Sequence, residues 1–64
     1  MADLLLLRTP QAARLLGVSI STLEHMRSYG IGPNYIRVGR QVRYRVADVH
    51  AFLDANTVST RKQM

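Results

Sequence analysis

The 64-residue sequence contains no cysteine and no tryptophan, and it has only four acidic residues. Without cysteine the chain forms no disulfide and offers no thiolate, and His25 and His50 lack the neighbouring partners that a zinc site needs. The absence of cysteine also fits a reducing cytoplasm, where we expect the protein to act. The apolar run near the start, Leu4–Leu7, lies between Asp3 and Arg8 and is too short for a signal peptide or a membrane span.

No group of residues in the sequence indicates catalysis. The chain has no paired carboxylates and no clustered histidines, and Asp48 and Asp54 have the spacing of surface positions on a helix. A domain of this length hides only about 60% of its unfolded surface, which leaves no room for a deep substrate pocket. We therefore expect a non-enzymatic protein without a cofactor or a metal.

Positive charge dominates the sequence. Nine Lys and Arg residues against four Asp and Glu residues give a formal net charge of +5. No acidic residue lies between Glu24 and Asp48, and the interval contains five arginines: Arg27, Arg37, Arg40, Arg43 and Arg45. Arginine suits bidentate contacts with phosphate or guanine. The pattern favours a polyanionic partner, although a solvated basic face would have the same composition.

Capping residues predict two short helices with a tight turn between them. The first opens at Thr9-Pro10, with Thr9 as N-cap and the proline at the first helical position, and ends at Gly17. Before it, Leu5–Leu7 forms either a short strand or a hydrophobic clasp. Ser19 is the N-cap of the second helix, which runs to about Tyr29. Two helices in this order predict a helix-turn-helix.

The second helix has an apolar side and a polar side. Leu23 and Met26 mark the side expected to be buried, and four polar residues point away from it: Ser21, Glu24, His25 and Ser28. A small polar face of this kind fits the major groove of DNA, although it also suits water. Glu24 is the discordant residue, because phosphates repel a carboxylate. It is tolerated if it accepts from cytosine N4 or holds Arg27 in place.

After residue 34 the pattern changes from helical to alternating, which predicts a β-hairpin around Gly39-Arg40-Gln41. A two-residue turn at Gly39-Arg40 would divide the apolar side chains between the two faces. A three-residue tip pairs Val38 with Val42 and Ile36 with Tyr44, and so keeps them together. We therefore expect the three-residue tip.

In that register Arg40 lies at the exposed tip, and Arg37 and Arg43 are neighbours on the outer face. Like charges on adjacent strands are unfavourable unless an anion lies between them. We interpret this pair as the physical sign that the hairpin binds phosphate.

A third helix is predicted over residues 46–55. Its buried stripe consists of Val46, Val49, Phe52 and Leu53, and Asp48 in the first turn suits the helix dipole. We divide the chain into a domain of residues 1–56 and a polar tail of residues 57–64, which we expect to be disordered or to act as an accessory arm. The predicted fold class is α+β, with about three short helices and a two-stranded β-hairpin.

Several segments in this order resemble the small helix-turn-helix proteins of the AlpA and excisionase type, whose fold is a reduced winged helix related to the MerR family. They are LRTPQAARLLGVS at residues 7–19, STLE at 21–24, GPNYIRVGR at 32–40, and VRY at 42–44 leading into ADV at 47–49. The resemblance covers residues 5–55. It implies that the second helix binds in the major groove and that the hairpin, the wing of the fold, reaches the minor groove or its backbone.

The resemblance assigns four recognition-helix residues to the major groove: Ser21, Thr22, His25 and Ser28. With the charge pattern, the wing and backbone contacts are Arg37, Arg40, Gln41 and Arg43. Further phosphate contacts are expected from Ser19, Arg27 and Arg45. Ile20 and His25 stand where the family often has basic residues, and Ile20 either touches a thymine methyl group or flanks the core.

Proteins of this group are encoded mainly on phages and integrative elements, and many are recombination directionality factors. The resemblance implies a sequence-preferring protein that binds duplex DNA cooperatively through head-to-tail contacts and bends attachment-site DNA, directing a tyrosine-type integrase toward excision. We expect this role because no ligand-sensing domain or dimerisation helix follows residue 56. The alternatives are an AlpA-like transcriptional regulator and an interaction adaptor without DNA contact. RNA binding is less favoured, because Tyr35 is the only plausible exposed ring.

Overall fold

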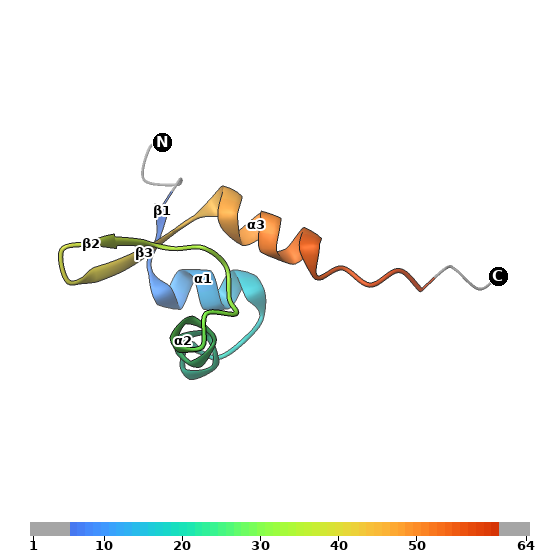
Figure 1. The fold of residues 1–64 in the computed structure, drawn as a ribbon, viewed down its shortest axis with the longest axis horizontal. Helices are drawn as coiled ribbons and strands as arrows, with labels where there is room; N and C mark the ends of the chain where they lie inside the picture. Colours follow the sequence, from blue (N-terminus) through green and yellow to red (C-terminus); the bar gives the residue numbers. More distant parts are fainter. Residues whose placement is uncertain (1–5, 61–64) are drawn as a thin grey trace.

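The computed structural model describes residues 6–60, which form three helices and three short strands (Figure 1). In chain order they are β1 (Leu6–Leu7), α1 (Thr9–Leu16), α2 (Ile20–Ser28), β2 (Ile36–Val38), β3 (Gln41–Arg45) and α3 (Val46–Ala55). The predicted α+β fold with three helices and a hairpin is confirmed. No helix within residues 6–60 is long and apolar enough to cross a membrane.

The first helix begins one residue earlier than its capping pattern predicts. Arg8 is the N-cap, and Thr9 is already helical. The side-chain carbonyl of Gln11 accepts a hydrogen bond from the Arg8 backbone N–H at 2.9 Å. A residue of the first helical turn therefore caps the N-terminus of α1. At the other end, the helix stops at Gly17 as predicted, and this glycine has the positive φ of 75° at which many helices end.

The second helix begins and ends as predicted. The hydroxyl oxygen of Ser19 accepts a hydrogen bond from the backbone N–H of Thr22 at 3.0 Å, which is the geometry of an N-cap. Tyr29 is the C-cap, and Gly30 follows with a φ of 70°. Capping residues at both ends therefore mark the bounds of α2.

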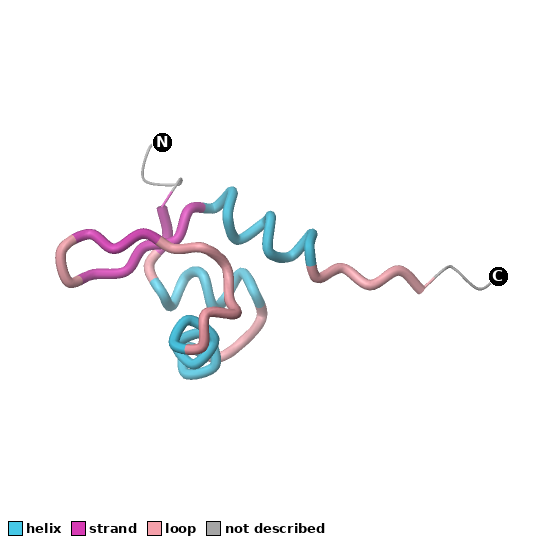
Figure 2. Tube along the Cα trace, in the orientation of Figure 1, coloured by secondary structure: helices cyan, strands magenta, loops and turns pink. Residues whose placement is uncertain are grey.

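The three strands form one antiparallel sheet in the order β1-β3-β2. β3 lies in the middle: its first residues pair with β2, and Tyr44 and Arg45 pair with Leu7 and Leu6 of β1. The apolar segment before α1 is thus a strand at Leu6–Leu7, and Leu5 lies outside the described residues. Figure 2 shows the β2–β3 hairpin, which we call the wing (residues 36–45), projecting beyond the helices on the side opposite the C-terminus.

The register of the wing differs from the prediction. Val38 pairs with Gln41 and Arg37 with Val42, so the turn is the two-residue Gly39-Arg40 loop and the predicted three-residue tip is wrong. Gly39 has a φ of 63°, and Arg40 does not have a positive φ. Glycine at the first central position is typical of one of the two turn types that suit a two-residue hairpin. The apolar pattern does not oppose this register, because Val38 lies far out on the wing and is 55% exposed. Turn geometry therefore decides the pairing.

Five side chains from all three helices and the central strand form the core: Ala12 and Ala13 of α1, Leu23 of α2, Tyr44 of β3 and Val49 of α3. The two alanines leave space for the neighbouring elements to approach α1 closely. Of the stripe predicted for α3, Val49 is fully buried and Val46 and Phe52 are half-buried. Leu53 is 38% exposed, which contradicts its predicted burial, because α3 extends past the core (Figure 1).

The C-terminal tail is described only in part. Residues 57–60 form no helix or strand and are exposed, and residues 61–64 lie outside the described part of the chain. The domain boundary at residue 56 and the disorder of the tail stay predictions.

Candidate nucleic-acid interface

Arg27 joins the second helix to the wing. Its guanidinium donates a hydrogen bond of 3.0 Å to the hydroxyl oxygen of Tyr44, whose side chain is fully buried. The same guanidinium lies 5.9 Å from the ring centroid of Tyr35, at cation–π distance, and the two tyrosine rings are 6.1 Å apart. These contacts connect α2 with β3, and both elements also pack against α1.

This arrangement changes the role that the sequence suggested for Arg27. The interpretation that Glu24 holds Arg27 in place is wrong, because the partner of Arg27 is Tyr44 on another element. Arg27 is half-buried, so it acts first as a link within the protein. A phosphate contact by its remaining N–H groups stays a prediction.

The four residues predicted for the major groove are all exposed on α2: Ser21, Thr22, His25 and Ser28. The hydroxyl of Thr22 accepts a hydrogen bond of 2.9 Å from the Ser19 hydroxyl, so these two side chains are also part of the helix cap. The ring of His25 lies edge-on to Tyr29 at 5.8 Å between centroids. None of the four carries a permanent positive charge, and Ile20 beside them is 45% exposed.

The first three arginines of the wing, Arg37, Arg40 and Arg43, divide into two groups. Arg37 and Arg40 are exposed. Arg43 is half-buried and already bonded, since its guanidinium donates to the Val42 carbonyl at 2.9 Å and to the side-chain oxygen of Gln41. Of these three, Arg37 and Arg40 are therefore the side chains with the most freedom to meet an anion.

The predicted repulsion between Arg37 and Arg43 does not exist in this register. Arg43 lies opposite Ile36, and Arg37 lies opposite Val42. Directly paired residues share a face and successive residues alternate, so Arg37 and Arg43 are on opposite faces of the wing. The prediction that they are neighbours is wrong, and the two guanidinium groups do not form a phosphate site between them.

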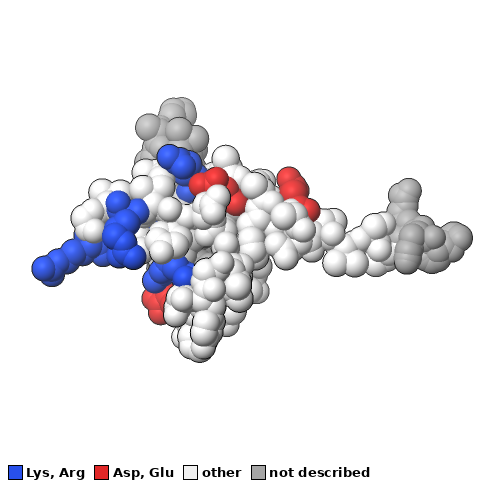
Figure 3. Space-filling view, in the orientation of Figure 1, with Lys and Arg blue, Asp and Glu red and all other residues white. Residues whose placement is uncertain are grey.

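Two further arginines are Arg45, the last residue of the wing, and Arg8, which precedes α1. Arg45 at the end of β3 is 3.7 Å from the carboxylate of Asp48, and its side chain is 61% exposed. Arg8 is also exposed and lines a shallow depression together with Gln41 and Arg43. Sequence patterns missed Arg8, because only the pairing of β1 with β3 brings it beside the wing. Figure 3 shows the basic groups over the wing and the adjoining middle of the molecule.

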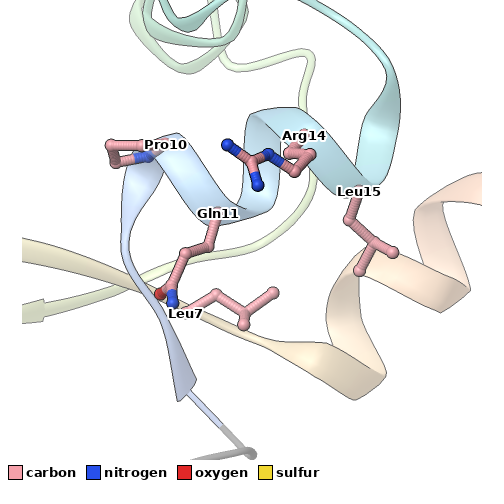
Figure 4. A pocket seen from close by; sticks show the side chains of 5 residues that line it. All are labelled: Leu7, Pro10, Gln11, Arg14 and Leu15. Atoms are coloured by element: carbon pink, nitrogen blue, oxygen red, sulfur yellow. The ribbon is translucent and has the colours of Figure 1, made fainter.

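Another shallow depression lies on α1 and is lined by Leu7, Pro10, Gln11, Arg14 and Leu15 (Figure 4). Its lining contains aliphatic groups, one amide and one guanidinium, and so offers neither a nucleophile nor a general base. Within residues 6–60, no three His, Cys, Asp or Glu side chains come together as metal ligands would.

A helix-turn-helix followed by an arginine-bearing hairpin defines the winged helix-turn-helix class of DNA-binding proteins. Comparison with known protein families shows that residues 6–57 match the family described as a helix-turn-helix domain. The match covers most of the chain, and the protein belongs to this family. A search of curated proteins gave no match.

Proposed function

We propose that the protein is a site-preferring DNA-binding protein that inserts α2 into the major groove and places the wing on the adjacent backbone. The observation that carries this proposal is the Arg27–Tyr44 hydrogen bond, which connects α2, with its exposed polar side, to β3 of the arginine-bearing wing. A protein whose two binding elements are already connected loses less conformational entropy on binding than one whose elements must first be ordered.

In this proposal the wing supplies affinity and the helix supplies register and modest preference. Arg37 and Arg40 are exposed guanidinium groups, whereas Ser21, His25 and Ser28 offer only short polar contacts. Phosphate contacts dominate affinity and base contacts carry sequence information. A domain with so few strong base contacts binds a single site weakly, and useful occupancy then requires several copies side by side.

We further propose an architectural role of the excisionase type. Copies of the protein line up head to tail on attachment-site DNA, bend it and direct a tyrosine-type integrase toward excision. This role is supported by the order of sequence segments that resembles AlpA and excisionase proteins. It is also supported by the weak binding expected at a single site, because useful occupancy then requires several copies.

Analytical ultracentrifugation on duplexes of increasing length tests the array. The proposal predicts that affinity per site rises once the duplex holds two or more adjacent sites. Strictly independent binding at every length contradicts it. Footprinting of an element's attachment site against the promoter of its own gene separates the two roles, because protection confined to the promoter favours the transcriptional regulator.

Salt dependence tests DNA binding itself. Each phosphate contact contributes about −0.9 to the slope of log affinity against log salt, so four to six contacts predict a slope of about −4 to −5. A shallow slope, or no binding to random duplex at low salt, favours an adaptor without DNA contact.

A further inference from the structure

Glu24 lies on the flank of α2 nearest the wing. It is one residue after the fully buried Leu23, and so about 100° around the helix axis from the core-facing side. Arg27, three residues further on, lies on the same flank and reaches Tyr44 in β3. The carboxylate of Glu24 therefore stands at the edge of the helix where the proposed major-groove contacts meet the wing.

This carboxylate is exposed and forms neither a hydrogen bond nor an ion pair within residues 6–60. The neighbour best placed to pair with it, Arg27, donates to Tyr44 instead. An acceptor-only group thus remains unpartnered beside a surface whose other charges are positive. On DNA it would face phosphates and base edges without compensation from the protein.

The major-groove edges of the bases differ in how they meet a carboxylate. Guanine presents two acceptors, thymine presents one acceptor and a methyl group, and adenine presents a donor next to the N7 acceptor. Cytosine presents only the N4 amino donor. A carboxylate is therefore matched by cytosine alone, and it repels the acceptor-bearing edges of the other bases.

We propose that Glu24 is a specificity-determining residue that selects one cytosine in the bound site by accepting from its N4 amino group. This inference rests on the proposed function, because it requires α2 in the major groove. The Glu24 contact would let α2 distinguish cytosine from the other bases, next to short polar side chains that adapt to several bases.

Site selection from a randomised duplex library tests the inference with the wild-type chain, Glu24→Ala and Glu24→Gln. The wild type should favour cytosine at one position by about 5- to 150-fold, the value of one good base contact. Glu24→Ala should lose the preference at that position and keep the rest of the motif. Glu24→Gln should favour adenine there, because a carboxamide both donates and accepts and so matches adenine N6 and N7.

Asp54→Asn is the matched control. Asp54 is exposed on α3, and its substitution removes the same charge as Glu24→Gln away from α2. All three variants should bind random duplex slightly more tightly, whereas only the Glu24 variants should change the base preference. An unchanged motif in both Glu24 variants overturns the role of Glu24. A wild-type chain that selects no motif contradicts the proposed function, and the inference fails with it.

Discussion

At the scale of single residues, the contact with the widest consequence is the hydrogen bond from Arg27 to Tyr44. Tyr44 is fully buried, and its hydroxyl brings a polar atom into the core. Arg27 supplies its partner, and no buried side-chain nitrogen or oxygen within residues 6–60 lacks one. The same bond connects α2 with the wing, so we expect it to contribute both to stability and to the interface.

Removal of the Tyr44 hydroxyl should lower the stability of the protein. Tyr44→Phe keeps the ring but takes away the acceptor for Arg27, and the free energy of unfolding should fall by about 1 kcal/mol. Urea denaturation measures the loss. Tyr35→Phe is the control, because its ring still lies beneath Arg27 and its hydroxyl has no hydrogen bond within residues 6–60. Equal losses of unfolding free energy in the two variants would show that the Arg27–Tyr44 hydrogen bond does not contribute measurably to stability.

Core truncation at Leu23 should have the largest effect on stability. Leu23 is fully buried at the centre of α2, so Leu23→Ala should cost about 2–5 kcal/mol. A domain this small has little more than that in total, and much of the variant should be unfolded at room temperature. Circular dichroism checks this, with Leu53→Ala as the control. Because Leu53 is 38% exposed, its truncation should cost clearly less.

At the scale of elements, the turn of the helix-turn-helix depends on the cap of α2. Ser19→Ala removes the acceptor for the Thr22 N–H and should lower the free energy of unfolding by about 1 kcal/mol. Ser21→Ala makes the same chemical change two residues later, at an exposed position inside the helix, and should be nearly neutral. Thermal unfolding of the two variants compares them directly. A neutral Ser19→Ala would mean that packing alone fixes the start of α2.

Alanine substitutions in the wing and in α2 should have different effects on DNA binding. Arg40→Ala at the turn should weaken binding to all duplexes and flatten the salt slope by about one unit. His25→Ala and Ser28→Ala should change which site is preferred, at about 1–3 kcal/mol where the side chain makes a good base contact. Fluorescence anisotropy on selected and random duplexes separates the two effects. Equal losses on both duplexes for His25 and Ser28 would place the base contacts elsewhere.

The elements themselves could be predicted better than their pairing. The residues of α3 follow from its apolar period, and the end of α1 follows from Gly17. The wing register could not be obtained from apolar alternation, because the outer wing is exposed and Gly39 favours a two-residue turn. The partner of Arg27 was also beyond prediction, since Tyr44 is 17 residues away and meets it only in the folded chain.

At the scale of the whole molecule, the described residues form a small core with one basic projection. The wing extends from one end and α3 from the other (Figure 1), and the exposed arginines Arg37 and Arg40 belong to the wing. Such a shape offers DNA one helix and one hairpin per copy. Its affinity should therefore depend on salt and on the number of adjacent copies more than on any single base contact.

The central claim is that α2 and the wing together form the DNA-binding face. Titration of the isotope-labelled protein with duplex DNA at low salt, followed by amide chemical shifts, tests it most directly. The account predicts that the largest changes occur at residues 19–29 and at Gly39-Arg40-Gln41, with His50 on the exposed side of α3 nearly unchanged. Changes concentrated on α3, or none at a concentration that shifts the duplex, would contradict it.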